Sequence, residues 1–260
     1  MFGFDRARTT AQAAATPMVG ARPAQTTPGA RIYAIGDVHG RLDLLQRLFR
    51  KIEADAQAGP PGGSTLVMLG DYIDRGPQSA GVLDWLLDGA GAALRLVALA
   101  GNHEESMLRF LDDIEVGPAW LYYGGSETLR SYGIAAPRHA DEPATLRRLQ
   151  DELKTRLPHR HRELLSTLPV SHVDGDFLFV HAGIRPGVPI AAQSRSDLLW
   201  IRDEFLRSDA DHGKVIVHGH TIAPEPELRR NRIGLDTGAF ATDRLSCVVL
   251  EATTQRILHT

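Results

Sequence analysis

The chain has 260 residues, of which 43% are hydrophobic and 23% are charged, and this composition is typical of a globular protein with one large core. The formal net charge of −3 excludes a broad electrostatic surface for nucleic acid or an anionic membrane. No apolar run approaches the roughly 20 residues that cross a bilayer, and residues 1–29 lack the continuous apolar stretch of a secretory signal. We therefore expect a soluble protein with a flexible tail over residues 1–29 and one compact domain over residues 30–260.

From residue 30 onward, an apolar strand, a glycine-bearing loop and an amphipathic helix follow one another three times, which predicts an α/β fold. The three predicted strands, at residues 31–35, 65–69 and 94–100, lead into "GDVHG", "GDYIDRG" and "GNHE". Helices are expected around residues 45–52, 80–89 and 104–113 from the spacing of apolar side chains. Because ligands bind at the carboxyl ends of strands in such sheets, these three loops are expected to meet at one site.

The middle of the chain, about residues 117–168, reads as a helical insertion that covers this site. Strand signals then return in "FLFVHAG", "KVIVHGH", "RIGLD" and "LSCVVLE". These runs are short and close together, so we expect them to form a second, more antiparallel sheet.

One cysteine, Cys247, cannot form an internal disulfide, which favours a reducing compartment and a cytoplasmic location. Cys247 lies in the apolar run "LSCVVLE" and is expected to be buried. A thiol-based phosphatase would need an arginine six residues after its cysteine, and this position is Thr253. That class of enzyme is excluded.

Polar side chains that suit metal binding or phosphate chemistry follow the predicted strands. A motif of four fixed residues such as G-D-x-H-G arises by chance at roughly 10⁻⁵ per position, so three such motifs in order, each after a strand, are not accidental. The candidates are Asp37, His39, Asp71, Asp74, Arg75, Asn102, His103, His181, His218 and His220.

With these motifs the chain resembles the metallophosphoesterase superfamily and, within it, the phosphoprotein phosphatase branch. The resemblance covers most of the chain from Ile32 to Leu250. It implies a four-layer α/β/β/α sandwich of two mixed sheets, with a helical insertion over a site that holds two divalent metal ions. It also implies a metal-dependent phosphatase in which a metal-bridging hydroxide attacks phosphorus in line.

The resemblance assigns a role to each candidate. Asp37 and His39 would hold the first metal ion, and Asp71 would bridge both ions. The second ion would be held by Asn102, His181 and His220. Histidine, carboxylate and amide ligands together suit manganese, our first choice, or iron or zinc, better than calcium.

The remaining catalytic roles follow from the same motifs. Arg75 would grip phosphate oxygens through its planar fork, and His103 would protonate the leaving group while Asp74 holds the other ring nitrogen. Arg202, in "LLWIRDEF", is a candidate second phosphate clamp, and the alternative is an ion pair on a helix face.

Several further residues have ambiguous roles. His218 is either a neighbour of the first metal ion or a residue that supports the ligands. His159 and His161 are expected on a solvated basic face, and the alternative is a contact with the substrate. The stretch "YYGG", with Trp120 nearby, either lines the pocket or forms a local core.

The motifs define the reaction better than the substrate. The first interpretation is a phosphatase acting on phosphoserine or phosphothreonine in proteins, and the alternative is symmetrical hydrolysis of dinucleoside polyphosphates such as diadenosine tetraphosphate. A polynucleotide or small-molecule phosphatase is a third option. Arg75 argues against a phosphodiesterase, and the complete ligand set argues against a silent scaffold. The expected partners are therefore phosphorylated proteins or small phosphate esters.

Overall fold

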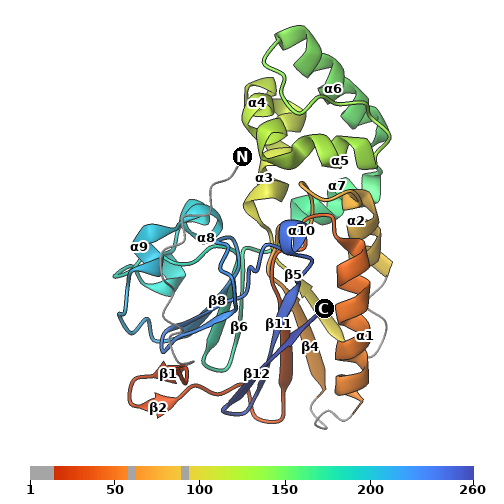
Figure 1. Cartoon of the computed structure of the whole chain (residues 1–260). Helices are drawn as coiled ribbons and strands as arrows, with labels where there is room; N and C mark the ends of the chain where they lie inside the picture. The colour runs from red at the N-terminus through yellow and green to blue at the C-terminus, as the bar shows by residue number, and fades with distance from the viewer. Residues whose placement is uncertain (1–14, 58–62, 89–93) are drawn as a thin grey trace.

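The computed structural model describes residues 15–57, 63–88 and 94–260, in which two five-stranded sheets pack face to face between layers of helices (Figure 1). The strands of the first sheet, in spatial order, are β12 (Thr254–His259), β11 (Ser246–Glu251), β3 (Arg31–Ile35), β4 (Ser64–Met68) and β5 (Arg95–Ala98). Those of the second sheet are β6 (Ser171–Asp174), β7 (Phe177–Val180), β8 (Val215–His218), β10 (Arg232–Gly234) and β9 (Glu227–Leu228).

Both sheets are mixed, and in each the parallel strands carry the motif loops. β3, β4 and β5 are parallel to one another, and so are β7, β8 and β10. β11 pairs antiparallel with β3, so the run "LSCVVLE" belongs to the first sheet. The prediction that this run belongs to the second sheet was wrong, because sequence order does not reveal which earlier strand a late strand will pair with.

The alternation of side chains along β3 explains the layers. Ile32 and Ala34 pack between the two sheets, whereas Tyr33 and Ile35 pack against helices on the outer face. Each such apolar side chain contributes about 1.5–3 kcal/mol by leaving water. A third apolar cluster joins the outer face of the second sheet to helices, and the four-layer fold predicted from the resemblance is therefore confirmed.

Helices α1 (Leu42–Ala56), α2 (Ser79–Asp88) and α3 (Asn102–Asp112) follow the three motif strands, as their apolar spacing predicts. Helices α8 (Arg195–Trp200) and α9 (Asp203–Leu206) flank the second sheet, with the short helix η3 (Ile190–Ala192) before them. The last helix, α10 (Ala239–Thr242), lies near the motif loops (Figure 1).

The segment between α3 and the second sheet is helical and packs against α3 and α2. It is drawn in green in Figure 1. It contains η1 (Ile114–Val116), α4 (Gly117–Trp120), η2 (Leu121–Gly125), α5 (Ser126–Ser131), α6 (Pro143–Arg156) and α7 (His159–Thr167). Pro158 separates α6 from α7, because proline cannot continue a helix that precedes it. The assignment of residues 117–168 as an insertion stays a prediction.

Part of the segment predicted as a flexible tail lies outside the described residues, namely 1–14. From Ala15 onward, the described part is held against the second sheet through the hairpin of β1 (Met18–Val19) and β2 (Arg22–Pro23). Arg22 donates to both carboxylate oxygens of Asp176, and Ala24 is buried. Among the described residues no helix is long and apolar enough to span a membrane.

Candidate metal centre and phosphate cleft

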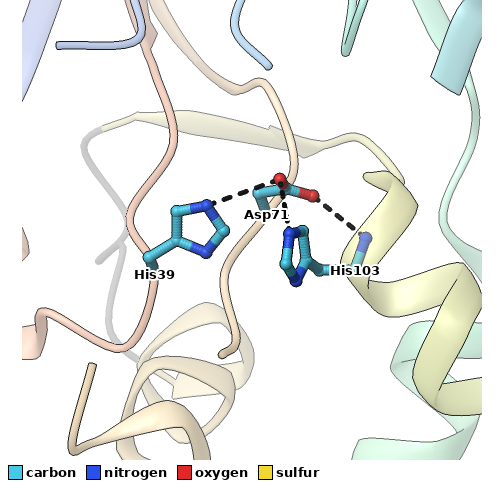
Figure 2. A group of neighbouring side chains, drawn as sticks. All are labelled: His39, Asp71 and His103. Atoms are coloured by element: carbon cyan, nitrogen blue, oxygen red, sulfur yellow. Dashed lines mark hydrogen bonds and ion pairs between the residues drawn. The ribbon is translucent and has the colours of Figure 1, made fainter. Parts of the chain in front are cut away.

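The predicted site residues meet at the carboxyl ends of strands from both sheets. The loops after β3 and β4 carry Asp37, His39 and Asp71, and the loops after β7 and β8 carry His181 and His220. Asn102 and His103 form the first turn of α3, one step beyond the loop in which they were expected. Figure 2 shows His39 and His103 turned toward the carboxylate of Asp71 from two different elements.

The backbone at this site is strained. In the described part of the chain, seven residues other than glycine have a positive φ, and five of them belong to the site. These five are His39, Asp71, Asp74, Arg75 and His220, with φ values of 46°, 51°, 72°, 66° and 64°. Such conformations cost of order 1–3 kcal/mol each and persist where the surrounding structure enforces them, which is typical of functional sites.

Asp71 belongs to two groups of side chains that could each hold a metal ion. Its Oδ2 lies 3.5 Å from His39 Nε2 and 3.7 Å from His103 Nε2, and its Oδ1 lies 3.4 Å from His181 Nε2. The donor atoms of His39, Asp71 and His103 are mutually close, as are those of Asp71, His181 and His220. A carboxylate that turns one oxygen to each group has the geometry of a bridging ligand.

Hydrogen bonds to the backbone leave the metal-facing nitrogens of two histidines without protons. The Nδ1–H of His39 donates to the carbonyl of Ile73 over 2.8 Å, and that of His181 donates to the carbonyl of Leu69 over 2.9 Å. In a neutral imidazole the other nitrogen, Nε2, then carries a lone pair. Both rings are therefore oriented as metal ligands usually are.

In the second group the lone pair of His181 Nε2 faces another acceptor, the side-chain oxygen of Asn102. His181 Nε2 lies 2.8 Å from Asn102 Oδ1 and 3.1 Å from His220 Nδ1. Acceptors directed at one another repel unless a cation lies between them, so the residues fit a bound cation. Their mixture of nitrogen and oxygen donors suits a transition metal better than calcium.

Burial keeps the histidines of this donor set neutral, as metal ligands must be, but it disfavours the charged carboxylate of Asp37. Burial lowers the pKa of His39 and His181, and it lowers the pKa of His220 to about 2 with the nearby His181 adding to the effect. Burial also raises the pKa of Asp37, and the carboxylates of Asp236 and Asp71 raise it further. A divalent cation would offset the carboxylate repulsion.

Asp37 lies beside the first group rather than within it. Its Oδ2 is 4.0 Å from His39 Nε2, and both of its carboxylate oxygens accept the backbone N–H of His220 at 3.1 Å. Gly219 makes this approach possible, because a Cβ there would lie 2.0 Å from Asp37 Oδ1. Asp37 is close enough to His39 to share a metal ion with it, as the sequence predicts.

His103 is hydrogen-bonded to the carboxylate of Asp74. We call these two residues the acid pair, because His103 is the expected general acid. Its Nδ1 lies 2.6 Å from Asp74 Oδ2, and the ring is 4% exposed. Burial alone would lower the pKa of His103, but the carboxylates of Asp71 and Asp74 raise it above the ordinary value. The other nitrogen, Nε2, faces the site, where it lies 3.0 Å from Arg75 Nη2. It can present a proton to a substrate once Arg75 turns to bind phosphate oxygens instead.

Two residues of the helical segment hold Asp74. The indole Nε1–H of Trp120 donates to Asp74 Oδ2 over 2.9 Å, and the hydroxyl of Thr128 donates to Oδ1 over 2.5 Å. The backbone N–H of Asp74 donates to Thr128 Oγ1 and to Ser79 Oγ. Trp120 is buried, so the tryptophan near "YYGG" belongs to a core and supports the acid pair as well.

Arg75 lies between the two histidines of the first group. Its Nη1 is 2.8 Å from His39 Nε2 and its Nη2 is 3.0 Å from His103 Nε2. The guanidinium also stacks on the ring of Phe240 at 4.9 Å. A forked cation at this position can bind two oxygens of one phosphate group.

A cleft of about 510 Å³ opens beside these groups. Asn102, Ser106 and Arg109, on one face of α3, line it together with Arg75. Arg202 also lines the cleft, and its Nη1 lies 3.3 Å from the carbonyl of His220. The structure thus places Arg202 at the cleft, in a position that suits a second phosphate contact.

One histidine differs from its expected setting. His161 was predicted on a solvated face, but it is 1% exposed and its ring bonds to Tyr132 and Asp84, so that prediction was wrong. His159 is exposed. His218 belongs to neither candidate metal group among the described residues, and its ring packs at 5.1 Å from that of Phe205. Cys247 is buried as expected, and burial raises its pKa.

Sequence reasoning missed three residues that shape the site. Glu104 accepts hydrogen bonds from the backbone of the Asp71 loop, Asp236 is buried and raises the pKa of Asp37, and Phe240 stacks on Arg75. Glu104 is the last residue of "GNHE", so the motif was identified from the sequence, but the role of Glu104 in holding the Asp71 loop was not predicted. Asp236 and Phe240 lie in "LDTGAF", whose glycine and buried acid follow a strand as in the other motif loops.

Comparisons with known proteins agree with this geometry. Residues 30–251 match the family described as calcineurin-like phosphoesterase. The chain is 30% identical to Serine/threonine-protein phosphatase 1 of Salmonella typhimurium over 223 residues, which cover 83% of this chain and 89% of that protein. It is 28% identical over 238 residues to the asymmetrical bis(5'-nucleosyl)-tetraphosphatase PrpE of Anoxybacillus flavithermus, covering 82% and 88% of the two chains.

A solved structure supports the fold alone. The cold-active protein-tyrosine phosphatase of a psychrophilic Shewanella superposes with a TM-score of 0.55 at 18% identity. The match covers 90% of this chain and 83% of that one.

Proposed function

Because the chain belongs to the calcineurin-like phosphoesterase family and is therefore a metal-dependent phosphoester hydrolase, we propose that it releases phosphate from phosphoserine and phosphothreonine in proteins. The observation that carries this proposal is the acid pair of His103 and Asp74 beside Arg75. A serine or threonine alkoxide is a poor leaving group and must be protonated as it departs. An imidazolium oriented by a buried carboxylate meets this need.

Asp37, His39, Asp71, Asn102, His181 and His220 are the proposed ligands of two divalent ions, with manganese as our first choice. When bound, the ions would activate a water molecule and neutralise charge on the phosphate. Asp71 would hold both, because each of its oxygens faces one group of donors.

The protein's own residues would then position the substrate. Arg75 would bind two phosphate oxygens through its fork, and Arg202, which lines the same cleft, would make a second contact with the phosphate. His103 protonates the leaving oxygen through Nε2, while Asp74 keeps the ring charged and oriented. For this proton transfer the leaving group would have to point toward His103 Nε2.

A second candidate is hydrolysis of a dinucleoside polyphosphate. The relatives named bis(5'-nucleosyl)-tetraphosphatase support it, and so does a pair of exposed tyrosines, Tyr122 and Tyr123, beside the cleft. For either substrate we keep the prediction of a cytoplasmic protein, which rests on its single cysteine.

The test compares leaving groups in His103→Asn. With a phosphothreonine peptide we expect kcat/KM to fall by about 10²–10⁴, because general acid catalysis is lost. With p-nitrophenyl phosphate, whose leaving group needs little protonation, we expect a loss below about tenfold. His159→Asn, at an exposed histidine, is the matched control and should behave as wild type. Equal losses on both substrates would contradict the acid role of His103.

A further inference from the structure

A second cavity lies next to the phosphate cleft. Its volume is about 460 Å³, and it shares Ala119 and Tyr123 with the cleft. Volumes of this size are typical of sites for small ligands. The two cavities together can hold a substrate longer than one phosphate group.

Aromatic rings line this second cavity and are open to solvent. Tyr122 and Tyr123 are each 59% exposed, with ring centroids 5.2 Å apart and planes at 84°. Tyr122 also lies over His139 at 5.5 Å and 37°. Adjacent exposed aromatic residues at the rim of a catalytic cleft indicate a binding surface, because soluble domains usually bury such rings.

The backbone ties these tyrosines to the phosphate-binding arginine. The carbonyl of Gly124 accepts the backbone N–H of Arg75 at 3.2 Å, and the carbonyl of Tyr123 accepts Arg75 Nε–H at 3.4 Å. Gly124 has a φ of 114°, and a Cβ there would lie 2.5 Å from the nitrogen of Arg75. The helical path is therefore kinked at Gly124. The backbone of Tyr123 and Gly124 is held at a fixed place relative to Arg75.

We propose that Tyr122, Tyr123 and His139, here called the tyrosine shelf, bind the nucleobase of a nucleotide substrate whose phosphate lies at Arg75. This inference rests on the proposed phosphoester hydrolysis. It specifies nucleotides, the substrate class of the second candidate function. Bases of any sequence stack on aromatic side chains. Because the two tyrosine planes are nearly perpendicular, one ring can stack on the face of a base while the other ring contacts the edge of the base. Asp141 at the rim of the cavity can accept a hydrogen bond from an exocyclic amine.

The test uses a double variant with a matched control. Tyr122→Leu with Tyr123→Leu keeps apolar side chains and removes the rings, whereas Tyr122→Phe with Tyr123→Phe keeps the rings. Tyr122 and Tyr123 are exposed, so both double variants should fold. Kinetics are measured with manganese on diadenosine tetraphosphate, p-nitrophenyl phosphate and a phosphothreonine peptide.

We expect the leucine variant to raise KM for diadenosine tetraphosphate by about 5- to 100-fold, the range that loss of base stacking gives. Its kcat on that substrate should change much less, and KM for p-nitrophenyl phosphate should change by a far smaller factor. The phenylalanine variant should stay within about threefold of wild type. This pattern separates ring stacking from general damage to the site.

Three results would overturn the proposal. An equal rise in KM for p-nitrophenyl phosphate would mean that the tyrosines act through Arg75, and an unchanged KM for the dinucleotide would mean that they bind no base. A rise confined to the phosphothreonine peptide would make the shelf a peptide-binding surface.

Binding of adenosine monophosphate to the metal-free chain, followed by saturation-transfer NMR, separates this proposal from the proposed function. Saturation of the adenine protons by wild type but not by the leucine variant supports the shelf even if no phosphate is released from any substrate. Absence of saturation in wild type counts against the shelf even if the phosphatase reaction is found.

Discussion

Replacing Glu104 by glutamine should destabilise the protein strongly, although the two side chains have nearly the same shape. Glu104 is 1% exposed, and its Oε2 accepts the backbone N–H groups of Gly101 and Asp71, both at 2.9 Å. Its Oε1 accepts those of Tyr72 at 2.8 Å and Ile73 at 3.3 Å. In glutamine one of these oxygens becomes an NH₂ group, which leaves two buried N–H groups without an acceptor.

Each unsatisfied buried donor costs about 1–3 kcal/mol, so Glu104→Gln should lower the free energy of unfolding by about 2–6 kcal/mol. That is a large part of the roughly 5–15 kcal/mol that stabilises a typical domain. Urea unfolding of the metal-free protein, followed by circular dichroism, measures the change. Because the same bonds hold the strained loop of Asp71, metal affinity should also fall.

The neighbouring residue on α3 supplies the control. Glu105 accepts hydrogen bonds from Arg195 Nε and Trp200 Nε1, both at 2.8 Å, near the surface. Glu105→Gln should therefore change stability by less than about 1 kcal/mol. If Glu104→Gln unfolds within 1 kcal/mol of wild type, the assignment of Glu104 as the anchor of the Asp71 loop is wrong.

Three further substitutions test the site itself. Asp71→Asn should reduce the number of manganese ions bound, measured by calorimetry, and lower turnover by more than about 100-fold, since the bridging charge is lost; two ions bound with unchanged affinity would disprove bridging. Asp74→Asn removes a carboxylate that raises the pKa of His103, so His103 should lose its proton at lower pH. The alkaline limb of the pH profile of kcat/KM for a phosphopeptide should therefore move to lower pH. An alkaline limb at the wild-type pH would argue against the pairing of His103 with Asp74. Arg75→Lys should raise KM for p-nitrophenyl phosphate by about tenfold or more, because an ammonium cannot replace the fork, and a wild-type KM would make Arg75 structural.

The α/β alternation and the place of the motif loops could be predicted because both depend on local patterns, whereas the four-layer arrangement came from the family resemblance. Each of β3, β4 and β5 is an apolar run that ends in a motif loop, and parallel strands necessarily bring those ends to one edge. The bridging geometry of Asp71 follows from that edge together with the loops of the second sheet. Local pattern and tertiary outcome agree here.

The rest depends on contacts between distant segments, which a single sequence does not display. The pairing of β11 with β3, the burial of His161 against Asp84 and the stacking of Phe240 on Arg75 each join residues far apart in the chain. Nothing local distinguishes His161 from the exposed His159 two residues earlier. Only the packing of α7 against α2 decides which ring is buried.

The helical segment after α3 contributes to the proposed chemistry as well as to the walls of the cleft. Trp120 and Thr128 hold the carboxylate of Asp74, and Gly124 accepts the backbone N–H of Arg75. The acid pair and the phosphate-binding arginine are therefore both positioned by the segment that also carries Tyr122 and Tyr123. The residues Trp120, Gly124 and Thr128 position the catalytic groups, and they lie in the same segment as the proposed shelf. A substitution in this segment that alters substrate preference must therefore leave these three residues in place. Tyr122 and Tyr123 are free of that constraint, because their side chains point to solvent.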